Sequence, residues 1–262
     1  MKQVLTIAGS DSGGGAGIQA DIKTIHANGC FGMSVITSIT AQNTREVTRA
    51  FDLPIDLIEA QLDAIFSDFD VSALKTGMLS SSEIVQTVAG KLRQFAPKNL
   101  VIDPVMISKS KFLLLKPQAI GSLKADLIPL ATVITPNVYE AELLAGCEIK
   151  TINDAKDAAK KIHGYGCQTV LVKGGHLLGD KSTDVLYADG DFTLFEVERI
   201  ETKNTHGTGC TYSAAIATHL ALGKDLVPAI QAAKEYITNA IRYSLNIGHG
   251  HGPTNHFFFL KQ

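Results

Sequence analysis

Residues 204–211 read Asn204-Thr205-His206-Gly207-Thr208-Gly209-Cys210-Thr211 and lead directly into Tyr212-Ser213-Ala214-Ala215, a run that a helix readily accepts. Glycines at the start of a helix leave backbone N–H groups exposed, and the positive end of the helix dipole points out at the same place. The segment therefore predicts an anion-binding seat, and phosphate is the anion most often held in one. The same field favours a thiolate at Cys210 and should lower its pKa. A Gly-rich turn before a buried helix, with Cys210 as a small apolar filler, fits the spacing equally well.

Length and composition describe a globular protein. The 262 residues are 45% hydrophobic, which is ample for a core that buries most of the apolar surface. No internal repeat, linker or low-complexity tract is visible, so we expect a single domain over residues 1–262. The net charge is −2, and the sequence has neither a basic block nor an acidic tail. This charge pattern argues against a nucleic-acid partner.

The compartment can be inferred from the first residues and from the cysteines. Met1-Lys2-Gln3 leads straight into an apolar strand, without a signal peptide or a membrane-spanning segment. The cysteines at positions 30, 147, 167 and 210 are scattered and form no C-x-x-C pair. Such usage is typical of a reducing compartment. We therefore expect a cytoplasmic protein without a membrane partner.

Short apolar strands alternate with amphipathic helices along most of the chain. Strands are predicted at 4–8, 33–41, 73–76, 99–102, 132–134 and 169–172. The helices include one that begins at Pro54, one behind a Ser80-x-x-Glu83 capping box, one capped by Asn153 and one over about 226–244. This alternation predicts an α/β fold with a mostly parallel central sheet and helices on both faces.

Two further segments read as strands outside this alternation. Residues 184–188 and 192–197 flank Asp189-Gly190, a strong hairpin signal, and predict a small antiparallel piece at one edge of the sheet. Residues 49–53 read as a short strand on a different surface.

A second glycine-rich loop follows the first strand and reads Gly9-Ser10-Asp11-Ser12-Gly13-Gly14-Gly15-Ala16-Gly17. A dinucleotide fingerprint does not fit, because Ile18 stands where the third glycine or alanine should be. A Walker loop does not fit either, since no G-K-S/T is present. The loop therefore predicts a close approach of backbone to a ligand, and an ordinary flexible connection is the alternative.

Polar residues follow the carboxyl ends of several predicted strands, at Gln42, Asp103, Asn137, Glu140 and Lys173. In an open parallel sheet this edge is where ligands bind. Taken singly, each has a structural explanation, since Asp103 or Asn137 could be a helix N-cap and Lys173 a solvated loop cation. Their convergence favours a binding site.

With these residues in view, the chain resembles the ribokinase-like superfamily, and within it the hydroxymethylpyrimidine/phosphomethylpyrimidine kinases of thiamine biosynthesis. The resemblance implies ATP-dependent phosphorylation of 4-amino-5-hydroxymethyl-2-methylpyrimidine to its monophosphate and then its diphosphate. It also implies a homodimer. The matching stretches span nearly the whole chain and are Ala8-Gly9-Ser10-Asp11, 13–21, Ala41-Gln42-Asn43-Thr44, 75–78, Asp103-Pro104-Val105-Met106, Thr135-Pro136-Asn137, 172–176 and 204–215.

The resemblance also assigns roles by position. The pyrimidine pocket would be lined by Gly9, Ala16, Asp21, Gln42 and Met78. The amide of Gln42 suits an aminopyrimidine, because it carries both a donor and an acceptor. Asp103 and Glu140 would act through Mg²⁺, in part through water, and Asn137 and Lys173 would contact the nucleotide, with Lys173 near the transferred phosphate. The anion hole would consist of Gly207, Thr208, Gly209 and Cys210.

Two departures bear on these roles. Most of the superfamily has aspartate as the base after Gly-Thr-Gly, whereas this chain has Cys210, as the pyrimidine kinases and some pyridoxal kinases do. We therefore expect Cys210 and Lys173 to be the catalytic residues, with Cys210 either the base or only part of the anion hole. The loop Lys109-Ser110-Lys111-Phe112 also differs from the usual Lys-Ser-Gly-Asp or Lys-Gly-Gly.

Three other functions are compatible with parts of the sequence. A pyridoxal kinase of the same cysteine-containing subgroup would share the fold and the anion hole, but it usually differs at residues 41–44. A non-catalytic vitamin or nucleotide sensor is disfavoured by the intact Asp103, Lys173 and Cys210. A metal site at His249-Gly250-His251 with His256 is disfavoured by the flexible glycines, which predict a solvated C-terminal loop.

Overall fold

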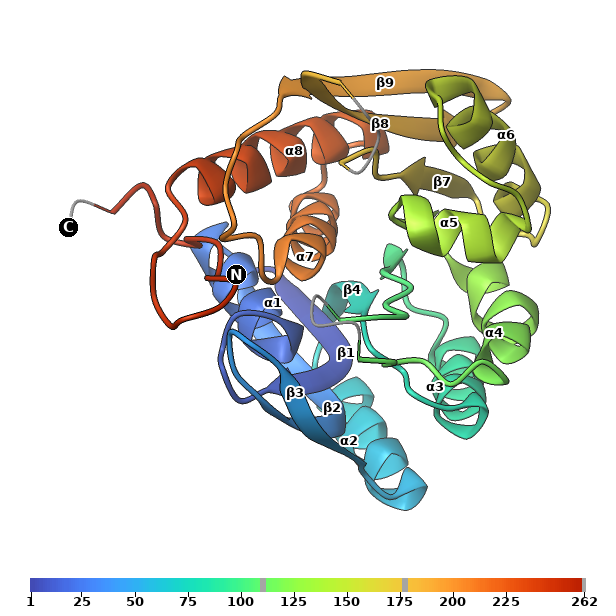
Figure 1. The fold of residues 1–262 in the computed structure, drawn as a ribbon. Helices are drawn as coiled ribbons and strands as arrows, with labels where there is room; N and C mark the ends of the chain where they lie inside the picture. Colours follow the sequence, from blue (N-terminus) through green and yellow to red (C-terminus); the bar gives the residue numbers. More distant parts are fainter. Residues whose placement is uncertain (109–111, 176–178, 261–262) are drawn as a thin grey trace.

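A computed structural model of the chain describes residues 1–108, 112–175 and 179–260. Within these residues a nine-stranded sheet has the strand order β3-β2-β1-β4-β5-β6-β7-β8-β9, and helices pack on both of its faces (Figure 1). The strands are β1 Gln3–Asp11, β2 Phe31–Gln42, β3 Val47–Asp52, β4 Val71–Thr76, β5 Leu100–Ile102, β6 Val133–Ile134, β7 Thr169–Val172, β8 Lys181–Ala188 and β9 Asp191–Glu198.

The centre of the sheet is parallel and one edge ends in a hairpin, as the sequence predicted. Strands β2, β1, β4, β5, β6 and β7 pair in parallel, whereas β8 and β9 are antiparallel. Asp189 and Gly190 have φ values of 52° and 87°. Positive φ at both positions is what a two-residue type I′ turn needs.

The opposite edge differs from the prediction. The segment expected on a different surface is β3, which pairs antiparallel with β2 in the same sheet. Of its side chains only Val47 is buried, and the others are half-buried or exposed, with Phe51 59% exposed. An edge strand that buries few side chains lacks the apolar pattern of the central strands, so its sequence did not place it in the main sheet. Its backbone hydrogen bonds nevertheless join it to that sheet.

The alternation of side chains along the strands builds two hydrophobic cores. Leu5, Ile7 and Leu74 point to the face covered by α2 Ile55–Asp68, α3 Ser82–Phe95, α4 Ala119–Ser122, α5 Val138–Ala145 and α6 Ile152–His163. Val4 and Ala73 point to the face covered by α1 Gly17–Ala27, α7 Thr208–Ala221 and α8 Leu226–Arg242. Neighbouring strand residues thus serve opposite cores, which is why the central strands are apolar throughout. No helix within the described ranges is long and apolar enough to cross a membrane.

Two predicted caps were wrong by one or two residues. Ser81, not Ser80, caps α3 by accepting from Ile84 N, and the Ser80 hydroxyl donates to Asp52 instead. Helix α6 begins two residues earlier than expected, with a capping box between Thr151 and Asp154. In both cases several Ser, Thr, Asp or Asn residues lie in a row, so composition alone could not select the cap.

The C-terminal segment with His249, His251 and His256 was predicted to be a solvated loop, and this holds for only part of it. His249 and His251 are exposed, whereas residues 252–256 are buried. His251 N donates to Thr44 O at 2.8 Å, and Gly252 N donates to the side chain of Asn204 at 3.1 Å. His206 N in turn donates to Gly252 O at 3.1 Å. The end of the chain is therefore hydrogen-bonded to two of the loops singled out in the sequence.

Candidate active site

The carboxyl ends of the parallel strands bring together residues that are far apart in the sequence. Asp103 directly follows β5 and Lys173 directly follows β7. Lys173 Nζ lies 2.8 Å from Asp103 Oδ1, and this ion pair is almost completely buried. Burial lowers the pKa of Lys173, but the charges of Asp103 and Glu140 outweigh this effect and raise it. Lys173 is therefore a fixed cation at neutral pH.

The predicted anion seat lies beside this pair. Helix α7 begins at Thr208, and Gly207 precedes it with φ 78°. A Cβ added at Gly209 would lie 3.4 Å from Lys173 Nζ and 3.5 Å from Asp103 Oδ2. The free N–H groups at the start of α7 and the Lys173 ammonium thus flank the same space, an arrangement that favours an anion.

Glycine is required at position 207 because the two glycine-rich loops touch there. A Cβ on Gly207 would overlap the carbonyl oxygen of Gly15, and a Cβ on Gly15 would overlap the His206 ring. Positive φ at Gly207 adds a second reason, since side chains rarely adopt it. The first loop therefore packs on the anion seat, which explains the glycine at position 15.

Asn137 caps a helix, which is the structural role that the sequence left open for it, and Glu140 takes part in the same cap. Asn137 Oδ1 accepts from Glu140 N at 2.9 Å, and Glu140 Oε2 accepts from Asn137 N at 2.8 Å, forming the capping box of α5. Burial raises the pKa of Glu140 to about 7; Lys173 opposes this shift and Asp103 adds to it. Glu140 is thus a cap whose charge is coupled to the Asp103–Lys173 pair.

The residues assigned to the pyrimidine pocket fall into two groups. A Cβ at Gly9 would lie 3.1 Å from Met78 Sδ, so these two residues are neighbours, and Gln42 ends β2 at the same edge. Asp21 is fully buried in α1, where it accepts from Lys75 Nζ at 2.8 Å and from Thr6 at 2.6 Å. Asp21 therefore lies beneath the surface of the site, paired with a fully buried lysine.

Cys210 does not have the acidic thiol that its helix position predicted. Burial raises the pKa of the Cys210 thiol to about 12, Lys75 opposes this shift, and Asp21 and Asp103 add to it. The expected lowering was wrong because loss of hydration outweighs the field of one helix end. At neutral pH Cys210 is a thiol.

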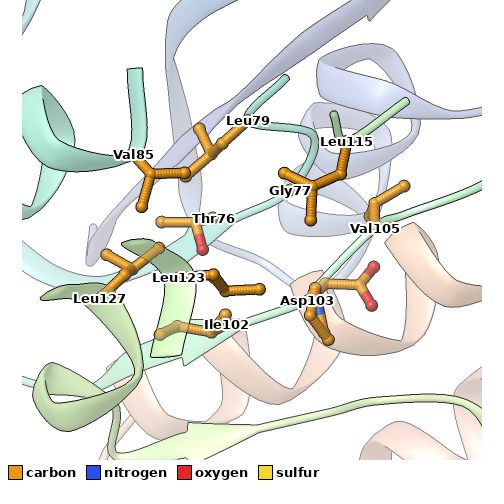
Figure 2. Close-up of a pocket in the computed structure, with 11 residues that line it drawn as sticks. Thr76, Gly77, Leu79, Val85, Ile102, Asp103, Val105, Leu115, Leu123 and Leu127 are labelled. Atoms are coloured by element: carbon orange, nitrogen blue, oxygen red, sulfur yellow. The ribbon is translucent and has the colours of Figure 1, made fainter. Parts of the chain in front are cut away.

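A small cavity lies behind the site and is too small for a substrate. Its volume is about 10 Å³, enough for about one water molecule. Figure 2 shows Asp103 at its edge, with the carboxylate turned away from Leu123 and Leu127. The apolar residues of this cavity thus lie behind Asp103. The two carboxylate oxygens of Asp103 face Lys173 and Ser213.

Comparison with known proteins identifies the family. The family model described as phosphomethylpyrimidine kinase matches residues 11–255. The chain belongs to this family. The hydroxymethylpyrimidine/phosphomethylpyrimidine kinase of Haemophilus influenzae is 49% identical over 100% of this chain and 98% of that protein. The thiamine biosynthesis bifunctional protein of Geobacter sulfurreducens is 50% identical over 97% of this chain, which spans only 52% of that protein.

Solved structures agree with the fold. The Bacillus subtilis pyridoxal kinase in its ADP complex has a TM-score of 0.93 with 45% identity, over 99% of this chain and 98% of that chain. The ribokinase-like fold is therefore confirmed, and the kinase assignment with it. The roles of individual site residues stay predictions.

Several residues of the kinase site were missed or lie outside the description. Lys109 and Lys111 of the altered loop, and His176 of a matching stretch, lie outside the described residues. Asp11, His206, Lys75 and Ser213 carry contacts that sequence reasoning did not assign. Asp11 could have been found, because it is a polar residue at the carboxyl end of a buried strand. His206 adjoins the anion seat in the sequence, but no pattern predicted a role for it.

Proposed function

We propose that this kinase transfers the terminal phosphoryl group of ATP to the hydroxymethyl group of 4-amino-5-hydroxymethyl-2-methylpyrimidine, and then phosphorylates the monophosphate to the diphosphate. The observation that carries the proposal is the Asp103–Lys173 pair beside the start of α7, with a 2.8 Å contact between the two side chains. Phosphoryl transfer needs positioned charge more than covalent chemistry, and this pair with the free N–H groups supplies it. The names of the relatives support the pyrimidine as substrate.

The anion seat and Lys173 would stabilise the transferred phosphoryl group from two sides. The N–H groups of Gly207, Gly209 and Cys210 would donate to phosphate oxygens, and Lys173 would add a positive charge. Asn137 forms an isolated parallel β-bridge with Lys173 and would contribute to nucleotide binding. The substrate hydroxyl would then approach between Cys210 and Gln42.

The acidic residues fit a magnesium ion bound together with phosphates. Mg²⁺ prefers oxygen ligands and is usually held by one or two carboxylates, water and substrate phosphates. Asp103 and Glu140 are a carboxylate pair of this kind, although the described residues contain no group of three potential ligands. The ion would neutralise charge on the phosphates. Lys173 Nζ holds Asp103 Oδ1, which orients the carboxylate in advance.

The role of Cys210 follows from its neutral thiol. A thiol in the first turn of α7 can donate its S–H toward the same space as the N–H groups of the seat. A loose transition state needs little proton abstraction before the phosphoryl group has arrived. We therefore place Cys210 among the catalytic residues as part of the anion hole, and the base role becomes the alternative to be tested.

A second activity is supported by one specific observation, the 45% identity to a pyridoxal kinase of known structure. Pyridoxal carries a hydroxymethyl group on a six-membered nitrogen ring of similar size. The segment Ala41-Gln42-Asn43-Thr44 favours the pyrimidine as the main substrate. Comparison of turnover of the two compounds measures how strong this preference is.

Product analysis tests the proposal. The purified protein is incubated with ATP, Mg²⁺ and the hydroxymethylpyrimidine, and phosphorylated products are separated by chromatography. We expect ADP with the pyrimidine monophosphate first and the diphosphate later. Absence of ADP formation in the presence of the pyrimidine, with the protein folded, would refute the proposal.

A further inference from the structure

The side chain of Gln42 belongs to a polar network with Thr40, His206 and Asp11. Gln42 Nε2 is placed 3.3 Å from His206 Nε2, and Gln42 Oε1 is placed 3.1 Å from Thr40 Oγ1. The Gln42 backbone is held by Ser12, whose hydroxyl accepts from Gln42 N and donates to Gln42 O, each at 2.8 Å. The amide ends of glutamine have the same shape, so their orientation must follow from the partners.

The Asp11 carboxylate decides which atom of Gln42 faces His206. Asp11 Oδ2 lies 2.9 Å from His206 Nε2, and the carboxylate also accepts from backbone N–H groups of the first loop. Burial raises the pKa of Asp11, but the hydrogen bond and charge of His206 and two backbone N–H groups outweigh it, so the pKa lies below its usual value. An ionised carboxylate only accepts, so His206 Nε2 must carry a proton, whatever the state of Nδ1. A protonated Nε2 has no lone pair to accept an N–H of Gln42, so the end of Gln42 that faces it must be the oxygen, at the longer branch of an N–H that it shares with Asp11.

Thr40 gives the same answer independently. Its hydroxyl has one proton and lies 2.9 Å from Ser10 O, which can only accept. That proton is therefore committed, and the Thr40 oxygen is left as an acceptor toward Gln42. The end of Gln42 that faces Thr40 must be the nitrogen. Both contacts require the amide to be rotated by half a turn, with Oε1 toward His206 and Nε2 toward Thr40.

We propose that Thr40 and His206 are positioning residues that hold the Gln42 amide in this orientation and thereby set the orientation and choice of the substrate ring. The inference rests on the proposed function. The amide keeps one N–H on the Thr40 side and one lone pair on the His206 side. An aminopyrimidine matches them, because its ring nitrogen accepts and the neighbouring amino group donates. The amino group would thus lie on the His206 side.

This orientation also aims the reacting hydroxyl. In the substrate the hydroxymethyl group is on the carbon next to the amino-bearing carbon, farther from the ring nitrogen that faces the Thr40 side. His206 directly precedes Gly207 and the anion seat in the chain. The hydroxymethyl group is therefore turned toward the seat, whereas the reverse amide would turn it away. In pyridoxal an aldehyde oxygen, which is an acceptor, replaces the amino group. Its lone pairs would face the oxygen of Gln42, and two acceptors form no hydrogen bond.

The test uses a substrate pair that reverses the hydrogen-bonding pattern. In the 4-oxo analogue of the hydroxymethylpyrimidine, the amino group becomes a carbonyl oxygen and the ring nitrogen carries a proton. We expect kcat/KM of the wild-type protein to favour the amino compound by about a thousandfold, since both contacts become repulsive. Binding of both compounds is measured by calorimetry in parallel. Equal turnover and binding of the two compounds would overturn the inference.

Matched variants separate positioning from a general structural role. Thr40→Val removes the acceptor but keeps the shape, and Thr40→Ser keeps the hydroxyl. His206→Met removes the ring N–H, and His206→Gln keeps an N–H at about the same reach. We expect Thr40→Val and His206→Met to reduce the amino-over-oxo preference about tenfold, and their controls to keep it.

A structural defect would lower turnover of both substrates together and leave their ratio unchanged. An unchanged ratio in Thr40→Val and His206→Met would therefore overturn the inference while the proposed function stands. Failure of the wild-type protein to bind or phosphorylate either pyrimidine would refute the proposed function, and this inference with it.

Discussion

Alkylation of Cys210 by iodoacetamide measures how much of its thiol is ionised, because the thiolate is the reacting form. Burial raises the pKa of Cys210 to about 12, compared with about 8.5 for a free cysteine. At pH 7.5 the thiolate fraction is then lower than that of a free cysteine by about 3000-fold. The higher nucleophilicity of a more basic thiolate recovers part of this difference. We expect Cys210 to react about a hundredfold more slowly than a free thiol in the same buffer.

The assay follows each cysteine separately by mass spectrometry of digested protein, with a small free thiol as the reference. Alkylation of Cys210 should rise tenfold per pH unit up to the highest pH at which the fold is stable, without a plateau near neutrality. A plateau below pH 9, or a rate equal to that of the free thiol at pH 7.5, would show that the helix end dominates over burial.

The same reasoning predicts the kinetics of Cys210 variants. Cys210→Ser keeps a donor in the anion seat, whereas Cys210→Asp introduces a carboxylate close to the phosphate. If the neutral thiol donates, serine should retain more kcat than aspartate, and alanine should lose about tenfold. A base role would reverse this order and cost alanine about 10²–10⁴-fold. Retention of activity by aspartate but not by serine would therefore refute the donor role.

Three further predictions follow from other parts of the site. Burial raises the pKa of Glu140 to about 7, so its negative charge is present above that pH and lost below it. The Mg²⁺ concentration for half-maximal rate should therefore rise as the pH is lowered from 8 to 6. Glu140→Gln should abolish this rise. Gln42→Leu should lower kcat/KM for the pyrimidine about tenfold or more with little change in Tm, and unchanged kinetics would show that Gln42 makes no contact. Gly207→Ala should destabilise the fold by about 3 kcal/mol, because it combines positive φ with overlap on Gly15 O. Gly223 has φ 87° and open space around it, so the control Gly223→Ala should cost only about 1 kcal/mol. Equal costs of the two variants in thermal denaturation would contradict the overlap.

Much of the fold could be predicted because local signals agreed with the global arrangement. The buried strands, the hairpin at Asp189-Gly190 and the start of α7 after Gly207 each have a sequence pattern with a direct physical cause. The edge strand β3 was misplaced because an exposed strand carries little hydrophobic pattern, and its pairing is made by backbone groups that are identical in every residue.

The site was predicted less completely for a related reason. Helix position was used to infer the pKa of Cys210, but burial beside Asp21 and Asp103 depends on packing that no local pattern records. The link between Asp11 and His206 spans most of the chain, so no spacing rule could reveal it. Resemblance named the candidate residues of the site, whereas the contacts that set their protonation required coordinates.

The backbone hydrogen bonds of residues 251 and 252 have a consequence for the order of folding. His251 is bonded to Thr44 and Gly252 to Asn204, so the loops at this edge of the sheet are joined by contacts between residues far apart in the sequence. Such contacts form only after the entropy of closing a long loop has been lost, whereas neighbouring strands and helices can form first. The loops around the start of α7 should therefore be completed late in folding, after the strands that carry Asp103 and Lys173.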